Sequence, residues 1–225
     1  MLNPRLSFAF NLYDNCNLAA DIGTDHAYLP AALISKEKCR RMILTDISES
    51  ALNNARKVIA KMQLNDRVLF RLGNGLLPLT EKCDMVSIMG MGGKTISSIL
   101  QDGYSHLSGA SLLLSAHTDI DLVRASISSI DYRIISEDPC FDSGRFYLFI
   151  KAVPGKEQLN EQQIRVGKKL SESNSPFLRS YLIRRREVLN SKLVGLISAE
   201  RKNQPAIIQT QMDMNYYDSI LEEKQ

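Results

Sequence analysis

The sequence lacks the spacings that metal sites and disulfide frameworks require. Its 225 residues include only four cysteines, with no C-x-x-C pair, and three histidines without ligand spacing. We therefore expect buried free thiols and no bound metal. No apolar run approaches the roughly 20 residues of a membrane span, and the first residues lack the apolar segment of a signal peptide. These absences predict a cytoplasmic protein without membrane association. The cysteines are Cys16, Cys39, Cys83 and Cys140.

What is present is ordinary for a soluble globular protein: 44% hydrophobic and 24% charged residues. The length suits one α/β domain plus an extra segment. Net charge is only +3, but residues 167–202 hold 9 basic and 3 acidic residues. Such a local excess can meet a polyanion. The alternative is a solvated helix face, which is the commoner meaning of a charge run.

The chain is organised around residues 21–30, Asp-Ile-Gly-Thr-Asp-His-Ala-Tyr-Leu-Pro. An apolar run precedes this block and a helical segment, 31–34, follows it, which predicts the first strand, turn and helix of an α/β sheet. Ligands of such sheets bind outside the carboxyl ends of the strands. Gly23 at the turn lets a ligand approach the main chain, and the carboxylates of Asp21 and Asp25 flank it.

This turn is not a dinucleotide fingerprint, because Asp25 and Tyr28 replace the second and third glycines of G-x-G-x-x-G. Two acids would repel a pyrophosphate. They suit a ligand with a cationic or hydrogen-bond-donating part, such as the amine and sulfonium of S-adenosylmethionine (SAM). The alternative is that Asp21 merely ends a strand and Asp25 caps a helix.

The next two strands end in further candidate cofactor residues. Residues 41–46 form a strand that ends in Asp46, where an acid typically hydrogen-bonds ribose hydroxyls. Ser48 is a good N-cap for a helix that runs to residue 61. After the strand at 68–71, Asn74 stands where an adenine would be held. The alternative for Asn74 and the following glycine is an ordinary turn.

Residues 84–89 and 110–115 form the fourth and fifth strands. A glycine-rich loop, 90–95, follows the fourth and leads into a helix at 96–100. The loop is not a phosphate loop, because the first glycine of that motif would fall on Ile88; it is interpreted as a wall of the pocket. His117 follows the fifth strand, and either a catalytic or a structural histidine fits that position.

Strands at 132–137 and 145–153, joined by a turn at 142–144, form a closing antiparallel hairpin. The resulting plan is a Rossmann-like α/β fold with strand order 3-2-1-4-5-7-6, as in SAM-dependent methyltransferases. We predict this domain over residues 1–153. Residues 154–225 are predicted to form a second domain, an α-helical, coiled-coil-like hairpin.

With these residues assembled, the chain resembles the bacterial tRNA (adenine-22-N1)-methyltransferases, the TrmK family. The resemblance rests on a short helix at 5–13 before the first strand, the 21–30 block, Gly-Met-Gly-Gly at 90–93, the hairpin with Arg-Phe-Tyr at 145–147 and the paired C-terminal helices. It implies a SAM-binding domain, a helical domain that helps hold tRNA, and Asp25 as the catalytic acid or base. A monomer is favoured.

Residues, spacing and resemblance together assign the site. The predicted cofactor-binding residues are Asp21, Gly23, Thr24, Asp46, Ile47, Asn74, Gly75 and Gly90. The predicted substrate-binding residues are His26, Tyr28, Met91, Gly92, Gly93, His117, Tyr147, Arg184, Arg185 and Arg186.

Three positions depart from the family pattern. The family more often has Glu at Asp46, usually has Asp-Gly at 74–75, and tends to carry Gln-Pro-Asn where this chain has Ser-Ala-His at 115–117. These departures leave open another RNA or a small molecule as substrate. They also leave open a non-catalytic RNA-binding protein that keeps the fold.

Overall fold

A computed structural model describes residues 2–201 and 203–224 and contains one seven-stranded sheet. Its order, β3-β2-β1-β4-β5-β7-β6, confirms the predicted plan. Strands β1 to β5 are parallel, and β7 lies antiparallel to both β5 and β6. The strands are β1 (Cys16–Ile22), β2 (Cys39–Asp46), β3 (Val68–Leu72), β4 (Met85–Met91), β5 (Ser111–Ala116), β6 (Tyr132–Asp142) and β7 (Arg145–Pro154).

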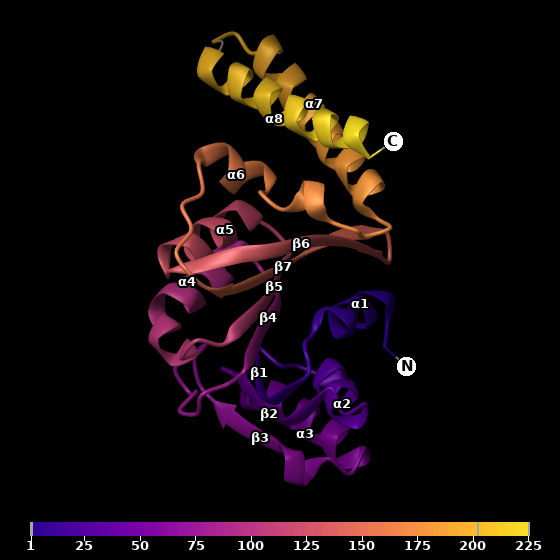
Figure 1. Ribbon diagram of the computed structural model, residues 1–225, viewed down its shortest axis with the longest axis vertical. Helices are drawn as coiled ribbons and strands as arrows, with labels where there is room; N and C mark the ends of the chain where they lie inside the picture. The colour runs from indigo at the N-terminus through magenta and orange to yellow at the C-terminus, as the bar shows by residue number, and fades with distance from the viewer. Residues whose placement is uncertain (1, 202, 225) are drawn as a thin grey trace.

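Helices cover both faces of this sheet (Figure 1). The first layer, α1, α2 and α3, packs on one face, and α4 and α5 pack on the other. The helices are α1 (Pro4–Leu12), α2 (Tyr28–Ser35), α3 (Glu49–Lys61), α4 (Gly93–Gly103), α5 (Ile120–Ser129), α6 (Glu161–Val166), α7 (Leu178–Ser198) and α8 (Gln204–Glu223). Short 3-10 helices are η1 (Asn65–Arg67), η2 (Tyr104–Leu107) and η3 (Leu170–Glu172).

The local sequence explains the elements around the site. Met42, Ile43 and Leu44 of β2 are fully buried, as expected for a strand covered on both faces. Helix α3 begins where predicted, because the Ser48 hydroxyl accepts a hydrogen bond from the Ala51 amide. The strands and caps thus hold the carboxyl edge of the sheet in a fixed place.

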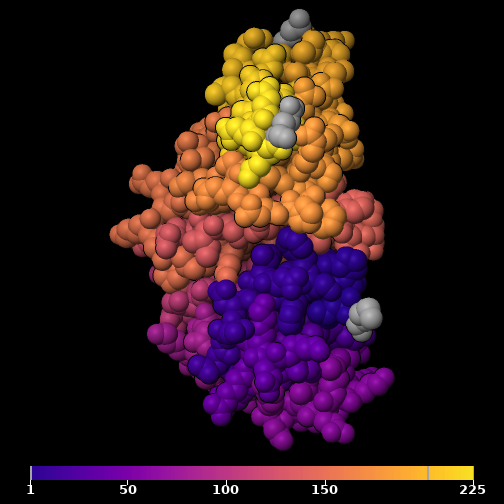
Figure 2. All heavy atoms as spheres, turned by 45° about the vertical axis from the view of Figure 1, so that its right-hand side comes forward, coloured from indigo at the N-terminus to yellow at the C-terminus, as the bar shows by residue number. Residues whose placement is uncertain are grey.

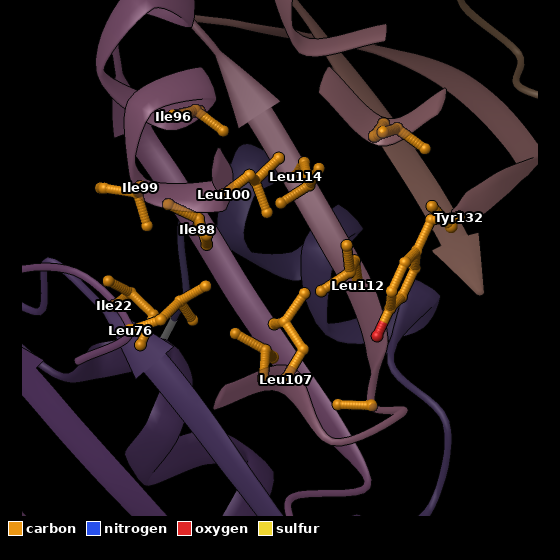
Figure 3. Close-up of a cluster of buried hydrophobic side chains, with 14 of the residues drawn as sticks. Ile22, Leu76, Ile88, Ile96, Ile99, Leu100, Leu107, Leu112, Leu114 and Tyr132 are labelled. Atoms are coloured by element: carbon orange, nitrogen blue, oxygen red, sulfur yellow. The ribbon is translucent and has the colours of Figure 1, made fainter. Parts of the chain in front are cut away.

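The core lies in two layers, one on each side of the sheet. Figure 3 shows Ile88 and Leu114 of neighbouring strands facing Leu100 of α4. All three side chains are fully buried, and each such burial contributes about 1.5–3 kcal/mol. The sheet is therefore a rigid platform for the turns at its carboxyl edge.

The glycine-rich segment differs from its prediction. Strand β4 continues to Met91 and α4 begins at Gly93, so the expected loop over residues 90–95 and helix start at 96 are wrong. The Gly93 amide donates to the Thr118 carbonyl at 2.9 Å. A Cβ on Gly93 would lie 2.0 Å from the Asp119 carbonyl oxygen. The close approach that the glycines permit here is therefore between two segments of this chain's own backbone.

A buried ion pair fastens the C-terminal part of the chain to the sheet. The Arg124 Nε donates to Glu137 at 2.6 Å, and both side chains are at most 1% exposed. The same arginine donates to the Ile164 and Arg165 carbonyls, and Glu137 accepts from the Lys169 amide at 2.8 Å. Their hydrogen-bonding capacity is thus used to hold the segment that leads to α7.

Helices α7 and α8 form the predicted helical hairpin beyond the β6 edge of the sheet, opposite β3 (Figure 1). They make the upper lobe of the space-filling view (Figure 2). Tyr181 of α7 and Tyr217 of α8 share an apolar cluster with Leu148 of β7. The domain boundary at residue 153 stays a prediction.

The four cysteines are free thiols, as expected, with Cys16 only partly buried. Within residues 2–201 and 203–224, no helix is long and apolar enough to cross a membrane. In the same described residues, no group of three or more His, Cys, Asp or Glu side chains is placed to hold a metal ion.

Candidate active site

The turns after β1, β2 and β3 are tied together at one edge of the sheet. The Thr45 carbonyl accepts hydrogen bonds from the amides of Gly23 and Thr24, at 2.8 and 3.0 Å. The neighbouring Asp46 carbonyl accepts from the Gly73 amide at 3.0 Å. These bonds bring the first two predicted cofactor turns together and place the third beside them.

Asp21 is anchored by two hydroxyl groups. Ser87 donates to one carboxylate oxygen and Thr24 to the other, each at 2.6 Å, and the Tyr13 phenol donates to Ser87 at 2.5 Å. Burial raises the pKa of Asp21, the two hydroxyl hydrogen bonds lower it, and the nearby Asp46 raises it. Sequence reasoning did not find Tyr13 and Ser87, because their link to Asp21 depends on strand pairing.

A cavity of about 420 Å³ opens beside Asp21. It is lined by eight of the predicted site residues: Asp21, Gly23, Thr24, Asp25, His26, Tyr28, Gly90 and His117. It is also lined by Arg5 of α1 and Phe149 of β7, which sequence reasoning did not assign to the site. The helix before β1 therefore forms part of the cavity wall, which only the folded arrangement reveals.

Gly23 carries a bare stretch of backbone beneath Met91. Its φ is +77°, and a Cβ there would lie 1.9 Å from the Met91 terminal methyl group. Any side chain at this position would therefore displace the end of Met91, so the missing side chain makes room for Met91 of this chain itself.

Asp25, His26 and Tyr28 form a cluster at the cavity rim. An Asp25 carboxylate oxygen lies 3.1 Å from His26 Nε2, and the two side chains are 60% and 55% exposed. The His26 and Tyr28 rings are 5.7 Å apart. The alternative in which Asp25 caps α2 is wrong, because the N-cap is Ala27 and no side chain caps it. The Asp25 carboxylate is thus available to a ligand.

His117 lines the cavity and contacts Tyr147, which lies outside the cavity's lining. Their rings are 5.8 Å apart in an edge-on arrangement, and the Arg5 guanidinium lies 4.9 Å from the Tyr147 ring centre. The His117 amide donates to the Met91 carbonyl at 2.9 Å, which fixes the loop after β5 against β4.

The remaining cofactor predictions lie on neighbouring turns, outside this cavity's lining. Asp46 accepts a hydrogen bond from the Ser48 amide at 2.8 Å, and Ile47 is 73% exposed. Asn74 is exposed, whereas Gly75 is buried and a Cβ there would lie 3.0 Å from Ile99. Close packing against Ile99 therefore accounts for a glycine at position 75. Their cofactor roles stay predictions.

The family is decided by comparison with known proteins. A family model described as TrmK, tRNA (adenine(22)-N(1))-methyltransferase, matches residues 19–217. The chain belongs to this family. The resemblance seen in the sequence is therefore confirmed, together with its methyltransferase fold.

Comparisons with individual TrmK proteins agree with this family assignment. The tRNA (adenine(22)-N(1))-methyltransferase of Bacillus subtilis (strain 168) is 30% identical over 156 residues, which cover 68% of this chain and 66% of the relative. The chain thus spans just under two thirds of that relative's length. TrmK of M. capricolum in complex with S-adenosyl-homocysteine is 26% identical, with a TM-score of 0.80 and 99% and 98% coverage. B. subtilis TrmK, 24% identical with a TM-score of 0.83, supports the fold alone; 98% of this chain and 99% of that chain are covered.

In this TrmK member, the three consecutive arginines lie apart from the cavity, on α7. Arg184 pairs with Glu187 at 3.0 Å and Arg186 with Asp218 at 2.5 Å. Arg185 lies half-buried between them, and its Nε has no hydrogen-bond partner in the part of the chain that the structure describes. Gly92 and Gly93 also lie outside the cavity's lining. The substrate roles of these five residues stay predictions.

Proposed function

We propose that this protein transfers the methyl group of SAM to nitrogen 1 of adenine 22 in tRNA, as a cytoplasmic monomer. The observation that carries the proposal is the cavity at the carboxyl edge of the sheet. Asp21, held by Ser87, and Asp25, which does not cap α2, both line it. Family membership supports the same reaction.

The residues present fit SAM. Gly23 lines the cavity with main chain alone, and Asp21 offers a carboxylate for the cofactor's cationic end. Asp46 suits the ribose hydroxyls, and exposed Ile47 and Asn74 suit an adenine's face and edge. When bound, SAM supplies an electrophilic methyl group on its sulfonium.

Asp25 performs the protein's part of the chemistry. Adenine nitrogen 1 has a lone pair and needs no prior deprotonation, but its methylation leaves the base cationic. The Asp25 carboxylate stabilises that charge or accepts a proton from the exocyclic amine. Tyr28, which is 53% exposed at the rim, provides a face on which a flipped-out base stacks.

Methyl transfer from labelled SAM to tRNA, followed by nucleoside analysis, tests the proposal. Wild type should yield 1-methyladenosine at position 22. Asp25→Asn should lower kcat by about 100-fold or more and keep the dissociation constant for SAM within a few-fold. Asp66→Asn, an exposed acid in η1, is the matched control and should behave as wild type.

The same assay separates the other candidate functions. Transfer to another RNA, or to a small molecule with no salt-dependent tRNA binding, would change the substrate but keep the chemistry. SAM binding without any turnover would indicate a non-catalytic RNA-binding protein.

A further inference from the structure

A second cavity, of about 560 Å³, lies between the tip of the β6–β7 hairpin, the loop after β5, and α7. We refer to it as the hairpin cavity. The residues on which the inference depends are His117, Phe141, Arg145, Phe146, Tyr181 and Arg185. The reaction proposed above assigns no role to Phe141, Arg145, Phe146 or Tyr181.

The hairpin cavity adjoins the catalytic cavity through a shared residue. His117 lines both spaces. Strand β7 serves both as well, because successive side chains of a strand point to opposite faces. Phe146 lines the hairpin cavity, while Tyr147 meets His117 and Arg5 on the catalytic side. A ligand that fills both cavities would therefore lie across this strand.

Aromatic rings form one wall of the hairpin cavity. The Phe141 and Phe146 ring centres are 4.8 Å apart, and Phe146 lies 5.8 Å edge-on from Tyr181. Phe141 is 40% exposed although it is a large apolar side chain. Such a ring offers a face for stacking a base, which is how proteins hold single-stranded nucleotides.

Arginine side chains line another part of the hairpin cavity. Arg145, Arg184 and Arg185 contribute three guanidinium groups, and only Arg184 is paired with a carboxylate in the described chain. Arg185 is half-buried and contributes to the cavity lining. The single carboxylate in the lining, Asp119, already accepts a hydrogen bond from Thr118 at 2.8 Å.

We infer that the hairpin cavity binds a nucleotide of the same tRNA strand that flanks the target adenosine. Its base stacks on Phe141, and its phosphate accepts hydrogen bonds from Arg145 and Arg185. The inference rests on the proposed function and adds the site that holds the RNA beside the reacting base.

Steady-state kinetics with tRNA test this assignment. Phe141→Ala and Arg145→Ala should each raise KM for tRNA about tenfold, since a stacked base or a charged hydrogen bond is lost. The SAM dissociation constant should match wild type. For Arg145→Ala, the slope of log affinity against log salt should fall by about 0.7–0.9. Tyr104→Ala and Arg133→Ala, exposed residues away from the cavity, are the matched controls and should keep the wild-type KM.

A photo-crosslinking amino acid at position 141 gives an independent readout. The crosslink should map to a nucleotide next to the methylated adenosine. Unchanged KM values in both variants, or a crosslink elsewhere in the tRNA, would overturn the inference. The proposed function would still stand in that case, provided that the wild type methylates the tRNA. A wild type without transferase activity would overturn both, so the two failures are distinguishable.

Discussion

Replacing Ser87 by alanine removes the hydroxyl that links Tyr13 to Asp21. In the structure this hydroxyl donates to the Asp21 carboxylate at 2.6 Å and accepts from the Tyr13 phenol at 2.5 Å. Burial and the Asp21 charge both raise the pKa of Tyr13, so its phenol stays protonated and remains a donor. The substitution therefore breaks two hydrogen bonds with different consequences, one for binding and one for folding.

The size of each effect of Ser87→Ala depends on the group that loses its hydrogen-bond partner. A hydrogen bond to a charged group contributes about 1.5–3 kcal/mol, so loss of the Ser87 donor should weaken SAM binding by about 10- to 150-fold. The Tyr13 phenol, which is 2% exposed, would lose its acceptor, and an unsatisfied buried group costs about 1–3 kcal/mol of folding free energy.

Adding Tyr13→Phe to Ser87→Ala separates the two effects. The double variant has no orphaned phenol, so urea unfolding should recover most of the lost folding free energy. Calorimetry should still give the weakened SAM affinity, because the Asp21 carboxylate still lacks its donor. If Ser87→Ala binds SAM within twofold of wild type, or if Tyr13→Phe restores the affinity, the hydrogen bonds from Tyr13 through Ser87 do not position Asp21 for SAM. Either result would refute the reasoning.

Three further predictions, one of them with a paired control substitution, test the fold and the site. Burial raises the pKa of Asp21, so the wild type loses stability as the pH rises from the unfolded-state pKa of about 3.9 through the raised folded-state pKa. The melting temperature of Asp21→Asn should therefore rise relative to wild type over that interval, and the variant should lose SAM binding. A melting-temperature difference that does not change with pH would contradict this. Gly93→Ala should lower the unfolding free energy by about 1–3 kcal/mol through overpacking, whereas Gly195→Ala, with open space around it, should raise it by about 0.5–1 kcal/mol. Glu137→Gln should cost about 3–5 kcal/mol in urea unfolding because it leaves Arg124 charged and unpaired; a loss below 1 kcal/mol would refute the fastening role.

Local sequence was sufficient for most of the sheet. The alternation of apolar runs, turns and helical segments located the strands, and their order came from the likeness to the sheet of SAM-dependent methyltransferases. The Ser48 cap marked the start of α3 as expected. The 21–30 block placed Asp21 and Asp25 at one turn, and the structure brings both to one cavity. These features depend on neighbours in sequence, which a single chain displays directly.

Long-range pairing explains what sequence reasoning missed. The Tyr13–Ser87–Asp21 chain joins residues separated by 66 to 74 positions, and no local pattern announces it. Arg124 did leave a signal, since it stands four residues after Ile120 and three before Ile127, on the apolar side of α5. A charged residue at such a position implies a buried partner, but only the fold identifies that partner as Glu137.

The turn between β6 and β7 determines how the two cavities share one strand. Ser143 and Gly144 both have positive φ, 51° and 80°, as the two-residue turns that match the twist of a hairpin require. This turn pairs Phe141 with Phe146 and Cys140 with Tyr147. A shift of one residue would move each side chain of β7 to the other face, sending Phe146 toward the catalytic cavity and Tyr147 toward α7. Which cavity each β7 side chain lines therefore depends on the register that these two turn residues set.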